Sequence, residues 1–181
     1  MAGIARIASG TPWEPIFGYT RAVKAGGWLA VSGTTSFDDK GLIVGRNQMY
    51  VQARQAIANI ATALNRAGMS LADVVRTRMF VTDMGRFVEV ARAHLEAFGA
   101  NPPASTVVEI RRLVNPDMMI EIEADAYLAS AGSDAEAGSV KSRRPAKSKA
   151  VAKPKAAVLS KRVAKKPTAK KASGKQARKR R

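Results

Sequence analysis

The last 41 residues of this 181-residue chain carry its entire positive net charge. Of the 31 Lys and Arg residues, 18 lie in residues 141–181, a segment without Asp or Glu. Residues 1–140 hold the other 13 with all 14 Asp and Glu residues and are nearly neutral, whereas the whole chain has a formal charge of +17. Because so charged a segment cannot bury a core, we predict a folded domain at 1–130, a small-residue linker at 131–140 and a basic tail at 141–181.

The basic tail is a low-complexity mixture of Lys, Ala and Pro that resembles the C-terminal domains of linker histones. It has no aromatic residue, and Pro145, Pro154 and Pro167 interrupt it, so we expect it to be disordered. Clustered cations bind phosphate backbones by counterion release, without reading sequence. We predict non-specific nucleic-acid binding by residues that include Lys165, Lys166, Lys170, Lys171, Arg178, Lys179, Arg180 and Arg181. A solubilising extension is the alternative; an anionic membrane is disfavoured because no apolar anchor accompanies the charge.

The chain has no cysteine, which excludes a disulfide framework, a thiolate nucleophile and a Cys-ligated metal. No apolar stretch approaches the roughly 20 residues that cross a bilayer, and the first residues lack the pattern of a signal peptide. These features predict a cytoplasmic protein with no membrane partner, associated with the nucleoid if the tail binds DNA. The sequence contains no phosphate or dinucleotide fingerprint, and we expect neither a cofactor nor a metal.

Hydrophobic periodicity predicts five strands and two helices in the folded domain. The strands are expected at 18–26, 28–34, 74–81, 104–111 and 118–128, and the helices at 48–67 and 84–98. In the first helix Ile57, Ile60, Ala61 and Leu64 recur at helical spacing, and Gly68 supplies the stop. The apolar face of the second helix is predicted to consist of Phe87, Val90, Ala91, His94 and Phe98.

The strand at 118–128 has the clearest alternation in the chain. Its even positions from Ile120 to Ala126 are apolar, whereas Glu121, Glu123 and Asp125 point to the opposite side. The order β-β-α-β-α-β-β predicts an α+β fold in which both helices cover one face of a mixed sheet. The other face is left uncovered, so we expect an oligomer.

The single histidine and the three carboxylates of the strand at 118–128 are candidates for catalysis or metal binding. His94 is the only histidine, and its place on an apolar helix face favours a core or half-buried residue over a catalytic one. Alternate residues of one strand lie roughly 6–7 Å apart, so the three carboxylates are too widely spaced to hold one small cation by themselves. The wall of a polar cavity is therefore preferred to a metal site.

Three stretches of the folded domain resemble the RidA (YjgF-type) family of enamine/imine deaminases. They are GYTRAVKAGGWLAVSGTT at 18–35, QARQAIANIATALNRAGMSLADVVRTRMFVTD at 52–83 and PASTVVEIRRLVNPDMMIEIEADA at 103–126. The resemblance implies a chorismate-mutase-like fold and a homotrimer whose sheets line a central barrel, with small-molecule clefts between subunits. It also assigns substrate-binding roles to Tyr19, Ser32 and the adjacent Gly33, and the catalytic role to Glu121.

One element of the family's cleft is missing from this sequence. Members that hydrolyse 2-imino acids have an Arg that clamps the substrate carboxylate, and Ser105 stands at that position here. A hydroxyl cannot replace the two charge-assisted hydrogen bonds of a guanidinium. Arg78 is a candidate substitute, and Ser105 and Thr106 are further candidate substrate-binding residues. The resemblance therefore implies a protein that binds a small imine or carbonyl compound. Deaminase-like hydrolysis of this compound would proceed without the Arg that clamps the substrate carboxylate. The alternative is a non-enzymatic nucleoid-associated protein that uses this domain for trimerisation.

Overall fold

The computed structural model describes residues 3–129, so the predicted linker and tail, including all eight proposed nucleic-acid-binding residues, lie outside the described residues. In chain order its main elements are β1 (Ile4–Ile7), α1 (Trp13–Phe17), β2 (Ala22–Ala25), β3 (Trp28–Thr34), α2 (Met49–Arg66), β4 (Val74–Val81), α3 (Phe87–Phe98), β5 (Ala104–Glu109) and β6 (Ile120–Tyr127). Short 3₁₀ turns at Leu71–Asp73 and Met84–Arg86 precede β4 and α3.

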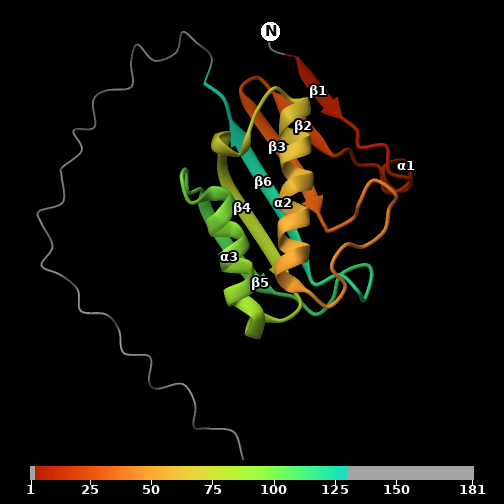
Figure 1. The fold of residues 1–181 in the computed structure, drawn as a ribbon. Helices are drawn as coiled ribbons and strands as arrows, with labels where there is room; N and C mark the ends of the chain where they lie inside the picture. Colours follow the sequence, from red (N-terminus) through yellow and green to blue (C-terminus); the bar gives the residue numbers. More distant parts are fainter. Residues whose placement is uncertain (1–2, 130–181) are drawn as a thin grey trace, which may run out of the picture. The chain divides into compact units, whose positions relative to one another are not determined.

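The strands form one six-stranded sheet in the order β1-β2-β3-β6-β4-β5. Neighbouring strands are antiparallel except β4 and β5, which are parallel. Helices α2 and α3 both lie against the same face of this sheet (Figure 1). The predicted α+β fold, with two helices on one face of a mixed sheet, is therefore confirmed. We call the opposite side the open face of the sheet.

Small and branched side chains allow α2 to pack closely on the centre of the sheet. The helix buries Ala53, Ala56, Ile60 and Leu64, and the facing strands bury Leu29, Val31, Ile120, Ile122, Ala124 and Ala126. Alanines on both surfaces bring the two backbones near each other, and the branched residues fill the remaining volume. This packing fixes β6 with its even-numbered residues toward the helix. Its odd-numbered carboxylates consequently lie on the open face.

The fully buried side chain of Gln52 fixes the start of β6 relative to α2. Its amide nitrogen donates to the carbonyls of Asp117 (2.7 Å) and Gly45 (3.2 Å), and its amide oxygen accepts from the Met119 N–H (2.8 Å). Both donors and the acceptor of this side chain are thus satisfied, which removes the cost of burying it. These bonds hold the segment that enters β6 just before Glu121.

Most predicted boundaries agree with the structure; two boundaries and one residue of the predicted buried helix face differ for local reasons. Strand β2 begins only at Ala22, because Gly18 adopts a left-handed conformation (φ 74°) at the end of α1. The helix predicted at 84–98 starts with a 3₁₀ turn, in which Asp83 accepts a hydrogen bond from the Gly85 N–H. Phe87 was predicted on the buried helix face but is 45% exposed, because α3 lies over the edge of the sheet.

Candidate functional site

The site begins with the three carboxylates of β6 on the open face. Arg78 of β4 forms ion pairs with two of them, Glu123 at 3.5 Å and Asp125 at 3.2 Å. Glu121 does not share this cation; with Glu123, Phe80 and Arg112 it lines a hollow of about 320 Å³. Arg78 therefore lies on the same face as Glu121, but its guanidinium is engaged by its neighbours.

A β-bulge in β3 brings the Glu121 carboxyl onto the backbone of the neighbouring strand. Val31 pairs with Ala124 and Thr34 with Ile122, so β3 holds one more residue than β6 between these pairs. A Cβ atom at Gly33 would overlap Oε1 of Glu121 and would lie 2.9 Å from its Cδ. Only glycine leaves room for the carboxyl there. The structure thus places Gly33 and Glu121 next to each other.

Arg21 fastens the bulge and connects it to Tyr19. Its Nη1 donates to the Gly33 carbonyl (2.8 Å) and to Thr34 Oγ1 (2.9 Å), and its Nη2 donates to the Tyr19 hydroxyl (3.3 Å). The Arg21 guanidinium also lies 5.6 Å from the centre of the Tyr19 ring, which is within cation–π range. Sequence reasoning missed Arg21, although its position two residues after Tyr19 in an extended segment gave a signal that both side chains share one side.

Ser32 forms hydrogen bonds with the backbone of the segment that precedes β2. Its hydroxyl donates to the Thr20 carbonyl at 2.7 Å, and its N–H donates to the Arg21 carbonyl at 3.0 Å. The single hydroxyl proton is therefore used within the protein, and only the oxygen lone pairs of Ser32 are available to a ligand. Tyr19, Ser32, Gly33 and Glu121, with Arg21, form one group that we call the carboxyl half-site.

The protonated form of the Glu121 carboxyl is more favoured in the protein than it is for a glutamate side chain in water. Burial raises the pKa of the Glu121 carboxyl above its ordinary value, the neighbouring Glu123 carboxylate raises it further, and Arg21 opposes the rise. A carboxyl whose pKa is raised takes up and releases a proton nearer neutral pH, which is the property of a general acid or base.

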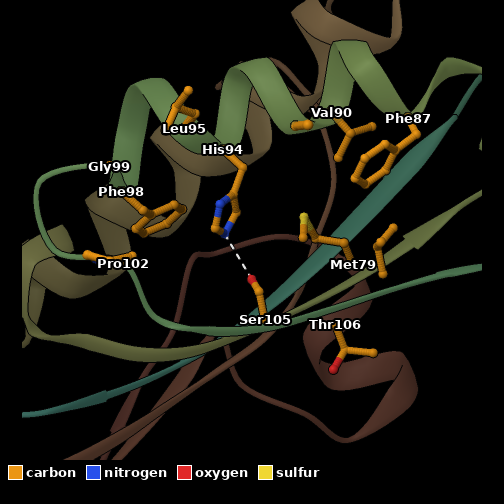
Figure 2. A pocket seen from close by; sticks show the side chains of 12 residues that line it. Met79, Phe87, Val90, His94, Leu95, Phe98, Gly99, Pro102, Ser105 and Thr106 are labelled. Atoms are coloured by element: carbon orange, nitrogen blue, oxygen red, sulfur yellow. Dashed lines mark hydrogen bonds between the residues drawn. The ribbon is translucent and has the colours of Figure 1, made fainter. Parts of the chain in front are cut away.

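Ser105 lies on the other side of the sheet. In the parallel β4–β5 pair it is the partner of Thr77, whose side chain is fully buried on the helix side. His94 of α3 reaches down to both hydroxyls, and Figure 2 shows its ring directed at Ser105. Thr106 follows on the opposite side of β5 in the same view. Ser105, His94 and Thr77 form a second group that we call the hydroxyl half-site.

The two half-sites do not meet within one chain. The side chain of Glu121 alternates with the helix-covered residues of β6 and points to the open face, whereas Ser105 lies on the helix side of the sheet, where it meets His94 of α3. Within residues 3–129 no cluster of His, Asp and Glu side chains has the arrangement of a metal site. No helix in the same part of the chain is long and apolar enough to cross a membrane.

These features define an α+β protein with two helices on one face of a mixed sheet and a carboxyl-containing candidate site on the open face. Residues 11–128 match the family model described as endoribonuclease L-PSP. The chain belongs to this family, which confirms the RidA (YjgF-type) resemblance.

Two solved structures and one curated relative support the same assignment. The chain is 41% identical to Rv2704 of Mycobacterium tuberculosis, a member of the YjgF/YER057c/UK114 family; the match covers 70% of this chain and all of that one, with a TM-score of 0.64. The YjgF gene product of E. coli is 30% identical, with 69% and 94% coverage and a TM-score of 0.58. The RutC family protein PH0854 of Pyrococcus horikoshii is 38% identical over 63% of this chain and 90% of that protein.

Replacing Gly33 by Ala should move the Glu121 carboxyl out of its place without unfolding the protein. The added methyl group meets the end of a flexible side chain rather than backbone, so the free energy of unfolding should change by less than about 1 kcal/mol. The displaced carboxyl should become better hydrated, and its pKa should fall toward the ordinary value. Carboxyl-carbon NMR titration measures this; Gly3→Ala, which meets no atom within 4 Å, is the control. An unchanged Glu121 titration would contradict the close approach.

Proposed function

We propose that the protein is a homotrimer that binds a small imine- or carbonyl-type metabolite in clefts between subunits and hydrolyses imines weakly. The observation that carries this proposal is the Glu121 carboxyl held over Gly33 beside the Tyr19–Arg21 pair. The family resemblance, which implies inter-subunit clefts, gives a reason why each chain has its two half-sites on opposite faces. Each cleft would combine the carboxyl half-site of one subunit, with Glu121, and the hydroxyl half-site of its neighbour, with Ser105.

Exposed apolar residues near both half-sites support such an assembly. On α1, close to Tyr19, the side chains of Trp13, Ile16 and Phe17 are 57%, 73% and 82% exposed. On α3, beside the hydroxyl half-site, Val88 and Leu95 are 78% and 70% exposed. Apolar surface of this extent is usually covered in an assembly. A contact between these two unlike patches is heterologous, and it gives a closed ring when the rotation between subunits is one third of a full turn, as in the proposed trimer.

In the proposed reaction, water adds to the carbon of a C=N bond, and ammonia leaves to give the carbonyl product. Glu121 would take one proton from the attacking water and give it to the imine nitrogen, so that a carbinolamine forms. It would then move the hydroxyl proton of the carbinolamine to the amine nitrogen as the C–N bond breaks, so that ammonia leaves and the carboxylate is regenerated. Its raised pKa suits both transfers. The oxygen lone pairs of Ser32 and the Tyr19 hydroxyl would orient the substrate.

The replacement of the family's Arg by Ser105 should limit activity on imines that carry a carboxylate. Loss of such a clamp costs on the order of 2–4 kcal/mol, or roughly 30- to 1000-fold in rate. Arg78 would have to leave Glu123 and Asp125 to act as a substitute. We therefore propose that uncharged imines are the better substrates.

Glu121→Gln should lower the rate of hydrolysis of a neutral imine by at least about 100-fold, because the amide cannot accept the proton of water. In the wild type the rate should fall as the pH drops through the Glu121 pKa, which lies above the ordinary glutamate value, since a base must be deprotonated. Ammonia release measures the rate. Glu96→Gln, at an exposed position on α3, is the matched control. Equal rates for wild type and Glu121→Gln would refute the catalytic role.

A second function is favoured by the concentration of 18 basic residues in residues 141–181. We propose that this tail binds nucleic acid without sequence preference and holds the trimer on the nucleoid. Three tails on one trimer would add avidity, because the second and third contacts become intramolecular. If the cleft proves inactive, a non-enzymatic DNA-binding protein that uses the folded domain for trimerisation is the remaining candidate.

Duplex DNA binding should depend strongly on salt. About six phosphate contacts per tail imply a log–log slope of affinity against salt near roughly −5. Fluorescence anisotropy between about 50 and 200 mM salt measures this slope. Deleting residues 141–181 should abolish binding and leave the oligomeric state unchanged. Binding that survived the deletion, or hardly responded to salt, would place the contact on the folded domain.

A further inference from the structure

The hydroxyl half-site is a closed hydrogen-bonded triangle at the floor of a pocket. Nε2 of His94 lies 3.0 Å from Thr77 Oγ1 and 3.1 Å from Ser105 Oγ, and the two hydroxyls also contact each other. Thr77 is fully buried, so its hydroxyl is confined to this triangle. Ser105 is the member of the triangle that faces outward from the edge strand β5. The capacity for further hydrogen bonding is therefore presented by Ser105.

The pocket above this triangle is apolar and has a volume of about 330 Å³. In Figure 2, Phe98 and Pro102 lie on one side of His94 and Ser105, and Phe87 and Met79 lie on the other. None of the lining residues is Lys, Arg, Asp or Glu. The volume suits a small molecule with an apolar body the size of a phenyl or short branched group.

The triangle itself carries no charge at neutral pH. Burial among these apolar side chains lowers the pKa of His94 below its ordinary value, so the imidazole is neutral there. The Phe98 ring, whose centre lies 4.6 Å from that of the imidazole, forms part of this apolar cover. A ligand at the floor of the pocket thus meets neutral hydrogen-bond donors and acceptors. The family's Arg would present a guanidinium at the position of Ser105.

We propose that this pocket selects ligands with an uncharged carbonyl group, such as a ketone, ester or amide, attached to an apolar body. The carbonyl oxygen accepts a hydrogen bond from Ser105, whose oxygen is in turn held by Thr77 and His94. A carboxylate at the same place loses hydration and gains no cation, which is costly. This inference rests on the proposed function for the location of the cleft, and it adds the class of ligand that the cleft accepts.

Two probes of nearly equal shape test the selectivity on the full chain. Benzylacetone and hydrocinnamate share a phenylethyl body, and they differ in having a methyl ketone or a carboxylate. Because His94 is the only histidine, its Hε1 proton gives a single, unambiguous NMR signal that reports directly on the triangle. At neutral pH we expect benzylacetone to shift this signal and to bind at least about tenfold more tightly than hydrocinnamate.

Variants at position 105 connect the selectivity to the hydroxyl. Ser105→Ala should weaken benzylacetone binding roughly fivefold, the cost of about one neutral hydrogen bond. Ser105→Arg should reverse the preference, because a guanidinium pairs with the carboxylate of hydrocinnamate. Thr62→Val removes an exposed hydroxyl on α2 and should change neither affinity.

The two probes are compared on the wild-type protein, so this test does not depend on whether any variant folds. Hydrocinnamate binding as tightly as benzylacetone, or neither probe moving the His94 signal, would overturn the inference. So would an unchanged benzylacetone affinity in a folded Ser105→Ala protein. The proposed hydrolysis is judged separately by the Glu121→Gln rates. A failure of the selectivity is thereby distinguished from a failure of the catalytic proposal.

Discussion

The carboxyl half-site depends on the close approach of the Glu121 carboxyl to the backbone at Gly33. An extra residue in β3 opens this space, and the absence of a side chain at Gly33 keeps it open. Arg21 then holds the bulge by donating to the Gly33 carbonyl and to Thr34. From the other strand, Gln52 fixes the segment that leads into β6. Each of these contacts restricts where the carboxyl can lie.

The sheet separates two kinds of chemistry on its two faces. The open face has carboxylates, a guanidinium and a tyrosine near the bulge, whereas the helix-covered face has a neutral hydroxyl–imidazole triangle in an apolar pocket. One chain cannot bring the two half-sites together, because they point in opposite directions from neighbouring parts of one sheet. A second copy of the chain in a heterologous contact can do so, and the proposed cleft requires it.

Periodicity predicted the parts of the fold where one face of a long element is buried. The alternation of β6 gave both the packing of Ile122 and the position of Glu121 on the open face, and the spacing of Ile57, Ile60 and Leu64 gave α2. Strand β1 and helix α1, of four and five residues, are too short for such a signal. The resemblance led to Tyr19, Gly33 and Glu121, which the structure brings together.

The contacts of the hydroxyl half-site were beyond sequence reasoning. His94 and Ser105 are eleven positions apart on a helix and an edge strand, and their hydrogen bond follows from the parallel pairing of β4 with β5. Arg21 was missed because two of its four hydrogen-bond partners are backbone carbonyls at the bulge, those of Ser32 and Gly33. A sequence reports side-chain patterns more directly than backbone irregularities, and the omission of Arg21 arises from this.

The central claim is that the carboxyl half-site of one subunit lies against the hydroxyl half-site of the next. The chain has no cysteine, so a Phe17→Cys/Leu95→Cys double variant offers a short bismaleimide one reactive pair. These positions belong to α1 and α3, near opposite ends of the sheet within one chain (Figure 1). If the two half-sites meet, the double variant should give covalent dimers and trimers on a denaturing gel, and either single variant should give far fewer. Only monomers from the double variant would contradict the shared cleft.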